Sequence, residues 1–333
     1  MKPFTCAIIG ATGMVGAMFL MILEERKLPI SQLYPFASAR SAGKTVEFNG
    51  QAVPIQELTP ASFDYGIDVA LFAVDNNTSR TYAPIAAAKG CTVIDNSSAW
   101  RLAPDVPLVV PEVNGSDISM HRGIIANPNC CAAPAVVALK PLQDTYGLKR
   151  VVISTYQSVS GAGVDGMRDL DANLNGQEST FFPYPIAHNI IPHIDNFEET
   201  GYTGEEVKVM AEIQKILHAP NLKITATAVR VPVYTGHSLS MNVSLEKPFD
   251  MEELRRVLEN APGAVLYDDP SANRYPMPIM AAGNDNVYIG RVRRDLSCEN
   301  SLNMWVVTDN TRKGAATNAV QVLEKVMAGR NLD

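Results

Sequence analysis

The first part of the chain alternates continuous apolar runs with helical patterns. Apolar runs cover residues 4–9, 33–37, 68–74 and 92–95, and the stretch around residues 82–89 has a helical pattern. Runs without polar alternation are typical of parallel strands that are buried on both faces. Strands that alternate with helices predict a doubly wound α/β sheet.

A different pattern begins beyond residue 149. Residues 151–160 alternate as a strand that is partly exposed on one side, which predicts a second domain of the α+β kind. Residues 181–186 form an irregular arm rich in aromatic residues and proline, of the kind that often packs on a partner subunit. The predicted helices of this half are 164–174, 205–217 and 251–259, and its further strands are 224–229, 286–293 and 301–307.

Composition and charge exclude several classes of protein. The chain has 333 residues, of which 46% are hydrophobic and 19% charged, so it has room for two domains with ordinary cores. Its net charge of -7 argues against nucleic acid or an anionic membrane as the main partner. Because no apolar run approaches the roughly 20 residues of a membrane span, a cytoplasmic protein is expected. The five cysteines, odd in number and without C-x-x-C spacing, predict neither a disulfide framework nor a metal site.

A glycine-rich turn follows the first apolar run and leads into a helix. Its sequence is GATGMVG at residues 10–16, with glycines three residues apart. This spacing differs from G-x-G-x-x-G, but it allows the same tight turn and close backbone approach to a pyrophosphate at a helix N-terminus. The turn therefore predicts a dinucleotide site, and the alternative is a plain strand-to-helix turn.

The loop after the second predicted strand indicates which dinucleotide is bound. An Asp or Glu near this point would bind the ribose 2′-hydroxyl of NAD, and the loop has none. Instead Ser38, Arg40 and Ser41, with Lys44 further on, suit a 2′-phosphate, which predicts a preference for NADP. The alternative is a solvated polar loop. Beyond this loop, residues 46–54 alternate weakly and predict one extra strand.

The segment IIANPNCCAAP, residues 124–134, predicts a strand, a tight turn and a helix start. Pro128 biases Asn127 away from helix, whereas Pro134 is tolerated only in the first turn of a helix. Cys130 is then expected at a helix N-terminus, where unpaired N–H groups and the helix dipole favour a reactive thiolate. The alternative is a buried, unreactive cysteine, a description that also fits Cys131.

Four further residues are candidates from their local context. Arg101 lies where a strand leaves the sheet, so its guanidinium can bind phosphate or carboxylate, or form a surface ion pair. His237 follows a glycine at a strand start, where an imidazole can face a cleft. Glu212 and Lys215 lie three residues apart on one helix face, a pattern that most often makes a solvated ion pair.

Taken in order, the motifs of the chain resemble the aspartate-semialdehyde dehydrogenase family from residue 10 to the final helix. One such match is weak, but eight in sequence are highly specific. The matching segments are GATGMVG, LVVPEVN, NPNC, TYQSVSGAG, FPYPIAHNIIPHID, EEVKVMAEIQKIL, RVPVYTGHS and DNTRKGAATNAVQ.

The resemblance implies an architecture like that of glyceraldehyde-3-phosphate dehydrogenase. A Rossmann-like NADP-binding domain would cover residues 1–129 and be completed by the C-terminal helix 311–331. An α+β catalytic and dimerisation domain would cover residues 130–310. The implied assembly is a homodimer or homotetramer whose partners are a small-molecule substrate and phosphate, with no nucleic acid and no membrane.

The resemblance also implies a reaction: the reductive dephosphorylation of 4-aspartyl phosphate by NADPH, giving L-aspartate 4-semialdehyde for lysine, threonine and methionine biosynthesis. Cys130 would carry the acyl group as a thioester, since a thiolate can attack the acyl carbon. His237 would act as the base and Gln157 would orient the bound substrate.

Further residue roles follow from the same resemblance. Arg230 would clamp the substrate α-carboxylate, and Glu212 would receive the α-ammonium group. Arg101, Lys215 and Asn129 would form the phosphate site. The implied cofactor-binding residues are Gly10, Thr12, Gly13, Met14, Val15, Gly16, Ser38, Arg40, Ser41 and Asn310.

The chain departs from the family pattern in two places. The family commonly reads N-C-S-T at the nucleophile, whereas Cys130 is followed here by Cys131 and Ala132, so hydroxyls are lost from the helix start. After the third strand the usual Ser-Ala-Gly is replaced by a segment that contains Asp75 and Asn76. A carboxylate at position 75 would repel a pyrophosphate unless it is turned away or paired.

The resemblance leaves two alternative functions open. The first is another acyl-phosphate or acyl-thioester reductase, such as N-acetyl-glutamyl-phosphate reductase. Arg230 together with Glu212 argues for a free amino acid instead, because an N-acylated substrate has no ammonium group. The second is a catalytically silent relative that binds nucleotide or acts as a structural partner. The two departures suggest it, and it is opposed by the joint retention of Cys130, Gln157, Arg230 and His237.

Overall fold

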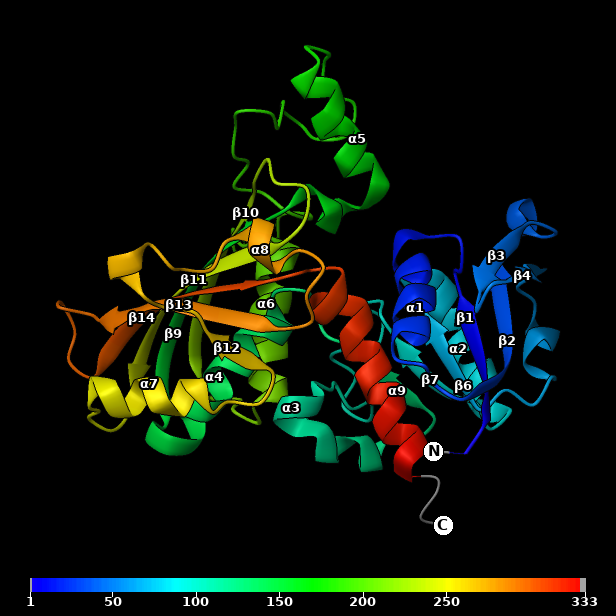
Figure 1. Ribbon diagram of the computed structural model, residues 1–333, viewed down its shortest axis with the longest axis horizontal. Coiled ribbons are helices and arrows are strands. Elements are labelled where there is room, and N and C mark those ends of the chain that lie inside the picture. The colour runs from blue at the N-terminus through cyan, green and yellow to red at the C-terminus, as the bar shows by residue number, and fades with distance from the viewer. Residues whose placement is uncertain (1, 330–333) are drawn as a thin grey trace. The chain divides into compact units, whose positions relative to one another are not determined.

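The structure is a computed structural model that describes residues 2–329 (Figure 1). The chain divides into two compact units. Unit 1 consists of residues 1–128 and 315–333, and unit 2 consists of residues 129–314.

Unit 1 is built on a six-stranded sheet with the strand order β5-β2-β1-β6-β7-β8. All of its strand pairs are parallel, as the continuous apolar runs predict. The predicted doubly wound α/β sheet is therefore confirmed. The strands are β1 (Phe4–Ile9), β2 (Ile30–Ala37), β5 (Gln56–Glu57), β6 (Val69–Phe72), β7 (Thr92–Asp95) and β8 (Ile124–Ala126).

The helices of unit 1 share one core with its sheet. The buried side chains of Phe19 and Ile22 on α1 belong to the same cluster as Ile8 on β1 and as Val320 and Leu323 on α9. The last part of the chain thus packs with the first. The helices are α1 (Met14–Glu25), α2 (Asn76–Ala88), α3 (Pro111–Asn114) and α9 (Thr317–Gly329), with short 3₁₀ turns at Ala39–Ser41, Pro60–Phe63 and Gly115–Met120.

The start of the terminal helix differs from a regular α-helix. A π-helical turn, Arg312–Ala316, precedes α9. The predicted helix over 311–331 extends over residues 330 and 331, which lie outside the described residues. Within the described part, the side chain of Asn318 donates hydrogen bonds to the Val109 carbonyl and to Asn127, both at 2.8 Å. These bonds fix α9 to the loops at the edge of the sheet.

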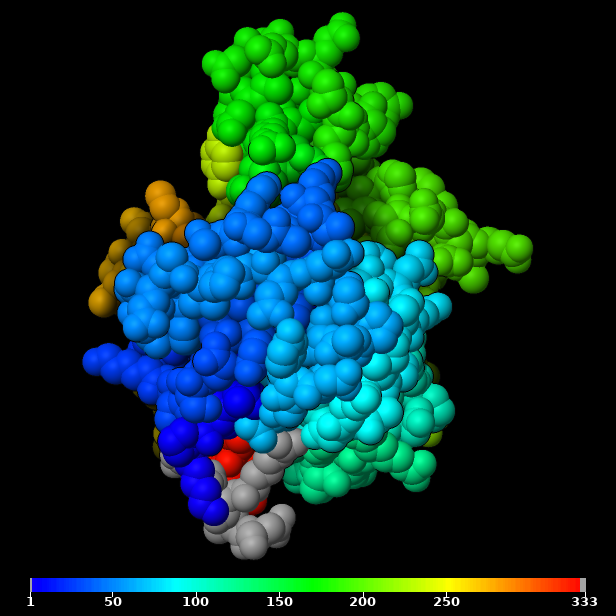
Figure 2. Space-filling model, turned by 90° about the vertical axis from the view of Figure 1, so that its right-hand side faces the viewer, coloured from blue at the N-terminus to red at the C-terminus, as the bar shows by residue number. Residues whose placement is uncertain are grey.

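The prediction of a single extra strand over 46–54 is wrong. Two short antiparallel strands, β3 (Thr45–Phe48) and β4 (Gln51–Pro54), form a hairpin instead. Asn49 and Gly50 between them have φ values of 50° and 71°. An Asn-Gly pair adopts positive φ readily and makes the tight turn of a two-residue hairpin. Most of the hairpin is exposed, and Figure 2 shows this early part of the chain in blue on the surface.

Unit 2 is built on a mixed six-stranded sheet with the order β10-β9-β11-β14-β13-β12. The β9–β10 and β12–β13 pairs are parallel and the others antiparallel, so the predicted α+β unit is confirmed. The strands are β9 (Leu148–Gln157), β10 (Lys223–Arg230), β11 (His237–Leu245), β12 (Ala264–Leu266), β13 (Val287–Arg294) and β14 (Ser301–Thr308). The helices are α4 (Ala132–Tyr146), α5 (Gly163–Leu174), α6 (Gly204–Ile216), α7 (Met251–Glu259) and α8 (Pro278–Ala281), with 3₁₀ turns at Val159–Ala162 and Pro270–Ala272.

Helices α4, α6 and α7 pack with the sheet of unit 2, whereas α5 and the segment after it form a separate small cluster (Figure 1). Asp169 on α5 organises this segment. Its carboxylate accepts N–H groups of Thr180, Phe181 and Phe182 and the hydroxyl of Ser179. Burial alone would raise the pKa of Asp169, but these hydrogen bonds outweigh it and lower the pKa. The first part of the aromatic arm is thus tied to α5 by this carboxylate, and the amide oxygen of Asn173 accepts the N–H of Ile186 at its end.

Among residues 2–329, no helix has the length and apolar character needed to cross a membrane.

Candidate active site

Cys130 lies in the turn that leads into α4. Cys131 is the N-cap of this helix, and the side-chain oxygen of Asn129 accepts the N–H groups of Cys131 at 2.8 Å and Ala132 at 3.3 Å. Pro134 falls in the first turn of α4, as predicted. Asn129 thus pairs two N–H groups at the helix start, so the loss of hydroxyls after Cys130 does not leave them without a partner.

His237 begins β11 and lies against the cysteine turn. A ring nitrogen of His237 and the sulfurs of Cys130 and Cys131 all lie within 4.8 Å of one another. Nδ1 of His237 contacts the backbone N–H of Ser158 at 3.1 Å and its Oγ at 3.0 Å. Because Ser158 holds Nδ1, Nε2 is the nitrogen left for proton exchange with the sulfur or a substrate.

The surroundings of Cys130 favour its thiolate. The pKa of Cys130 is lowered well below that of a free cysteine, chiefly by a hydrogen bond from the Cys131 thiol. The charge and hydrogen bonding of His237 and the charge of Arg230 act in the same direction, against burial. Burial and the neighbouring thiolate raise the pKa of Cys131, so the proton shared by the two sulfurs stays on Cys131.

Two sulfurs and an imidazole at this spacing are also donors of the kind that hold a soft metal, which the sequence did not predict. A metal would have to displace the proton of Cys131, because thiols ligate as thiolates. That proton donates the hydrogen bond that stabilises the Cys130 thiolate. The arrangement therefore favours a nucleophile over a metal centre.

Arg230 and Gln157 lie side by side at the ends of two paired strands. They are register partners in the β9–β10 pair, and both side chains are buried. Nη1 of Arg230 donates to the Ser158 carbonyl at 2.8 Å. A Cβ added at Gly161 would come within 2.9 Å of Nη1 of Arg230 and 3.0 Å of Nε2 of His237. Glycine at this position therefore leaves space in front of both groups, a requirement that the sequence did not reveal.

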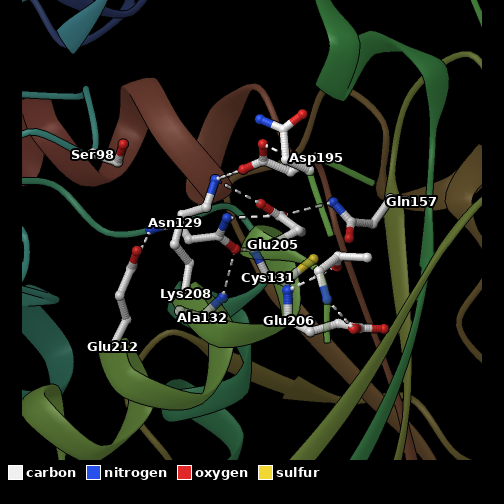
Figure 3. A network of polar contacts seen from close by, with 12 residues as sticks. Ser98, Asn129, Cys131, Ala132, Gln157, Asp195, Glu205, Glu206, Lys208 and Glu212 are labelled. Carbon is white, nitrogen blue, oxygen red and sulfur yellow. Dashed lines mark hydrogen bonds and ion pairs between the residues drawn. The ribbon is translucent and has the colours of Figure 1, made fainter. Parts of the chain in front are cut away.

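Glu205 is a buried carboxylate of the site that sequence reasoning missed. Its Oε1 accepts hydrogen bonds from the side-chain amides of Asn129 at 2.8 Å and Gln157 at 3.1 Å (Figure 3). Lys208 lies 3.5 Å from its other oxygen and 2.6 Å from Asp195. A signal existed, since Glu205 precedes Glu212 by seven residues and so lies on the same face of α6.

Glu212 and Lys215 occupy the same helix, α6. Glu212 is fully buried, and its Oε2 accepts the backbone N–H of Asn129 at 2.5 Å. Lys215 is partly buried one turn further on. A solvated ion pair, the common pattern for such spacing, does not describe the buried Glu212. The predicted contacts of these two side chains with substrate remain predictions.

Asn310, predicted to bind cofactor, has its side chain committed within unit 2. Its Oδ1 accepts the hydroxyls of Ser158 at 3.0 Å and Ser160 at 3.2 Å and the N–H of Gly236 at 2.9 Å. Through Ser158 it supports the imidazole of His237. The cofactor contact of Asn310 remains a prediction.

In unit 1, the glycine-rich turn joins β1 to α1 as predicted. Gly10 has a φ of 88°, and a Cβ there would lie 2.3 Å from the Ala73 carbonyl. A Cβ at Gly16 would lie 2.3 Å from the Gly10 carbonyl. Gly13 is exposed at the N-cap of α1, where its N–H donates to the Gly10 carbonyl and its own carbonyl accepts the Ala17 N–H. Thus Gly10 and Gly16 shape the turn, while Gly13 places no side chain in front of the helix start. Thr12 is exposed, and Met14 and Val15 are partly buried in the first turn of α1.

Asp75 does not present an unpaired carboxylate. It is the N-cap of α2, and its oxygens accept the N–H groups of Asn77 and Thr78 and the hydroxyl of Thr78. The hydrogen bonds from Thr78 lower the pKa of Asp75. The departure from the family pattern is therefore a helix cap, which satisfies the condition that the charge be paired.

The remaining predicted residues of unit 1 lie in loops after strands. Ser38 and Arg40 are exposed and Ser41 is buried in the turn after β2. Arg101 is buried in the loop after β7, where its Nη2 donates to the Asn96 carbonyl at 2.8 Å. Buried Asp95 shapes that loop by accepting the backbone N–H and hydroxyl of Ser97. Arg101 belongs to unit 1, and its predicted role in binding phosphate remains a prediction.

Family models match both units. Residues 5–121 match the semialdehyde dehydrogenase NAD binding domain, and residues 139–313 match the semialdehyde dehydrogenase dimerisation domain. Together with the fold and the cysteine site, these matches define an oxidoreductase of the semialdehyde dehydrogenase class.

Individual relatives identify the family within this class. The chain is 52% identical over 330 residues to the aspartate-semialdehyde dehydrogenase of Aquifex aeolicus (strain VF5), with 96% of this chain and 97% of the relative covered. The crystal structure of aspartate semialdehyde dehydrogenase II complexed with ASA from Vibrio cholerae has a TM-score of 0.93 and 43% identity, covering 98% of this chain and 99% of that one. The crystal structure of aspartate semialdehyde dehydrogenase with NADP from Candida albicans has a TM-score of 0.77 and 25% identity, covering 98% of this chain and 99% of that one. The chain belongs to the aspartate-semialdehyde dehydrogenase family.

Proposed function

We propose that this protein catalyses the NADPH-dependent reductive dephosphorylation of 4-aspartyl phosphate to L-aspartate 4-semialdehyde. The observation that carries the proposal is the cluster of Cys130, Cys131, His237 and Arg230, in which the pKa of the Cys130 thiol is lowered. A thiolate at neutral pH is the nucleophile that acyl transfer from an acyl phosphate requires.

Cys130 and His237 perform the covalent steps. The Cys130 thiolate attacks the acyl carbon, phosphate leaves with the bonding electrons, and a thioester forms. The chemistry supplied by bound NADPH is hydride transfer to the acyl carbon. His237 donates a proton to the acyl oxygen as the thiohemiacetal forms on Cys130. The same proton returns to His237 when the thiohemiacetal collapses, and Cys130 leaves as the thiolate.

The charged residues of the site select a free amino acid. Arg230 is buried, and burial lowers the pKa of its guanidinium, but arginine remains charged in proteins. It is therefore suited to a bidentate contact with the substrate α-carboxylate. Glu212 is assigned to the α-ammonium group and Gln157 to the acyl oxygen. Arg101, Lys215 and Asn129 are assigned to the phosphate.

Glu205 is assigned a positioning role in the same reaction. A single carboxylate oxygen that accepts two amide donors fixes the orientation of both Asn129 and Gln157. Each amide then presents its carbonyl and N–H groups in one arrangement, which reduces the ordering required when substrate binds.

The glycine-rich turn fits NADPH. Exposed Gly13 is the N-cap of α1, and the N–H groups of the first helical turn together with the helix dipole favour a pyrophosphate there. Residues 10–16 would hold the pyrophosphate, and Ser38, Arg40 and Ser41 would hold the 2′-phosphate. The NADP named with the Candida albicans enzyme supports this choice.

The deciding experiment is an assay of the purified protein. It should oxidise NADPH with 4-aspartyl phosphate, and in reverse reduce NADP with aspartate 4-semialdehyde only when phosphate or arsenate is present. Turnover of the semialdehyde without either anion would contradict an acyl phosphate product. The N-acetylglutamyl analogue, run beside the first substrate, should be a poor substrate because it lacks the ammonium group that Glu212 is assigned to bind.

The choice of NADP is tested by substitution of Arg40. Arg40→Ala should raise the KM for NADPH roughly tenfold or more, because one charged contact to a phosphate is lost, and should change that for NADH little. Lys27→Ala, at an exposed position after α1 and outside this loop, is the matched control for a general loss of positive charge. Equal effects of Arg40→Ala on both cofactors would contradict contact with a 2′-phosphate.

We further propose a homodimer or a homotetramer, which the match of residues 139–313 to a dimerisation domain supports. Sedimentation analysis of the purified chain distinguishes the two, and a monomer would contradict both. The expected cytoplasmic location stays a prediction.

A further inference from the structure

The second cysteine of the turn has no role in the reaction proposed above beyond its hydrogen bond. Its sulfur is fully buried and lies within 4.8 Å of the sulfur of Cys130, which is partly exposed. An oxidant from solvent therefore reaches Cys130 first. The thiol of Cys131 then lies next to the oxidised sulfur of Cys130.

We propose that Cys131 is a resolving thiol, which closes a disulfide with Cys130 after a hydroperoxide has oxidised Cys130 and so prevents irreversible loss of the nucleophile. Disulfide formation between the two cysteines does not depend on the proposed function. The effect of the disulfide on turnover rests on the function proposed for Cys130.

The oxidation proceeds in two balanced steps. First, the Cys130 thiolate attacks one oxygen of the hydroperoxide, the O–O bond breaks, and Cys130 becomes a sulfenic acid by a two-electron oxidation. Second, the sulfur of Cys131 attacks the sulfur of Cys130. The S–S bond forms, and the hydroxyl group leaves with the Cys131 proton as water. The hydroperoxide is the only oxidant consumed, and it is reduced to water or an alcohol.

Cys130 and Cys131 differ in pKa, as these two steps require. The thiolate is the form that reacts with peroxide, and the pKa of Cys130 is the one that is lowered. Cys131 keeps its proton because its pKa is raised by burial and by the neighbouring negative sulfur. Once Cys130 is a neutral sulfenic acid, that negative charge is gone, and Cys131 loses its proton more readily than before.

The resulting bond should be easy to reduce. The peptide between the two residues is trans, and Cα atoms across a trans peptide are about 3.8 Å apart, below the roughly 4.4 Å at the short end of ordinary disulfides. A ring closed between neighbouring residues is therefore strained, and strained disulfides are the readily reduced ones. Reduction by a dithiol restores both thiols and oxidises the reductant to its own disulfide.

The experiment treats the full-length protein with hydrogen peroxide, then denatures it in acid, alkylates free thiols and measures the mass of the peptide that contains Cys130 and Cys131. In the wild type this peptide should lose two hydrogens and take up no alkyl groups. Dithiothreitol should return both thiols and most of the activity.

Two substitutions at position 131 test the role directly. In Cys131→Ala, peroxide should carry Cys130 to the sulfinic acid, and the fraction of activity recovered by reductant should be roughly tenfold smaller than in the wild type. Cys131→Ser keeps the size and a hydrogen-bond donor, and should behave like Cys131→Ala in recovery. Cys298→Ala, which removes an exposed cysteine outside the cluster, is the matched control and should recover like the wild type.

The outcomes separate this proposal from the proposed function. A wild-type peptide with sulfinic Cys130 and an alkylated Cys131 would overturn the resolving role, whatever the activity. A disulfide that forms in a protein without turnover of aspartyl phosphate would refute the proposed reaction and leave the thiol pair in place.

Discussion

At the scale of single residues, the site depends on how each side chain is paired. Cys130 obtains its reactivity from the neighbouring Cys131 thiol, from His237 and from Arg230. The same few residues hold each other in place, since Ser158 binds both the imidazole of His237 and the guanidinium of Arg230. A change at one of these positions should therefore appear in the ionisation of Cys130.

The first prediction concerns the pH dependence of thiol alkylation. Because the pKa of Cys130 is lowered, its thiolate persists as the pH falls below about 8.5, the usual value for a cysteine, and is lost only when the pH passes through the lowered pKa. Iodoacetamide at mildly acidic pH should label Cys130 first, as measured by peptide masses over time. His237→Ala should move the pH profile of this labelling upward.

Exposed Cys298 provides the internal reference for the alkylation experiment. If Cys130 and Cys298 lost reactivity over the same pH range, the stabilised thiolate would be contradicted. Cys6 should remain unlabelled in the folded protein, because it is fully buried and burial raises the pKa of its thiol.

Sequence reasoning at this scale succeeded where the signal is local. The turn around Cys130 is encoded by Asn-Pro before it and by a proline tolerated only in a first helical turn, so the helix start followed from neighbours in the chain. Glu205 was missed because its importance comes from Asn129 and Gln157, which are 76 and 48 residues away. The seven-residue spacing to Glu212 places Glu205 on the same face of α6, but no pattern within a short window shows that Glu205 binds these two amides.

At the scale of elements, the ends of strands and helices do most of the positioning. β9, β10 and β11 deliver Gln157, Arg230 and His237 at their ends. Predicted strands and helices were mostly right in type, because their apolar periodicity is strong. The hairpin β3–β4 was missed because the weak alternation concealed an Asn-Gly turn, whose two positive φ angles divide one run into two strands.

Asn310 connects the segment after β9 with the turn before β11 and gives the second prediction. Its oxygen accepts hydrogen bonds from Ser158, Ser160 and Gly236, so Asn310→Ala should release the support of His237. We expect kcat to fall roughly tenfold or more while the KM for NADPH changes little. Steady-state kinetics decide between this role and the cofactor contact implied by the family resemblance.

The matched control is Asn303→Ala on β14, whose side chain pairs with Asn242. It should leave kcat within about twofold of wild type, as expected for a partly exposed pair without a link to the site. An Asn310→Ala variant with a raised KM for NADPH and an unchanged kcat would instead favour direct contact with the cofactor.

Asp75 gives the third prediction, which concerns the start of α2. Asp75→Ala should lower the free energy of unfolding of unit 1 by about 1 kcal/mol, since it removes a helix cap that accepts two backbone N–H groups. Asp75→Asn keeps a side-chain oxygen that can accept these hydrogen bonds. Its free energy of unfolding should therefore fall by only a few tenths of the decrease expected for Asp75→Ala. Urea unfolding followed by fluorescence measures both.

The same pair of variants tests whether the charge of Asp75 affects the cofactor. Because the carboxylate is already paired, Asp75→Asn should leave the KM for NADPH within about twofold of wild type. A clearly tighter KM in Asp75→Asn would show that the carboxylate repels the cofactor despite its partners.

At the scale of the whole molecule, the two units have separate cores and the chain passes between them twice, near residues 128 and 315. The net charge of -7 does not prevent the proposed binding of anionic substrates, because the assigned groups Arg101, Lys215 and Arg230 are local positive charges. Length and composition leave room for two domains, and the chain divides into two compact units.

The fourth prediction separates the stabilities of the units. Leu323 on α9 is fully buried in the core of unit 1, so Leu323→Ala should lower the stability of that unit by about 2–5 kcal/mol. The chain has two tryptophans, Trp100 in unit 1 and Trp305 in unit 2. Two single-tryptophan proteins are made by changing one tryptophan to Phe in each. The fluorescence of the remaining tryptophan then reports the urea unfolding of its own unit.

The transition reported by Trp100 should shift to lower urea in Leu323→Ala, whereas that reported by Trp305 should shift much less. Leu254→Ala, which removes a fully buried leucine from α7 in unit 2, is the reciprocal control. Equal shifts of both transitions in either variant would mean that the two units unfold as one.

The return of α9 to unit 1 also has a consequence for the order in which the protein is made. Phe19 and Ile22 emerge early from the ribosome, but Val320 and Leu323, with which they share a core, are among the last residues to be synthesised. Unit 2 lies entirely between these segments, so its residues are all available before unit 1 can close. During translation the sheet of unit 1 has all its strands but lacks α9, so the apolar surface that α9 covers stays exposed while unit 2 is made, which makes it the part of the nascent chain most dependent on chaperones.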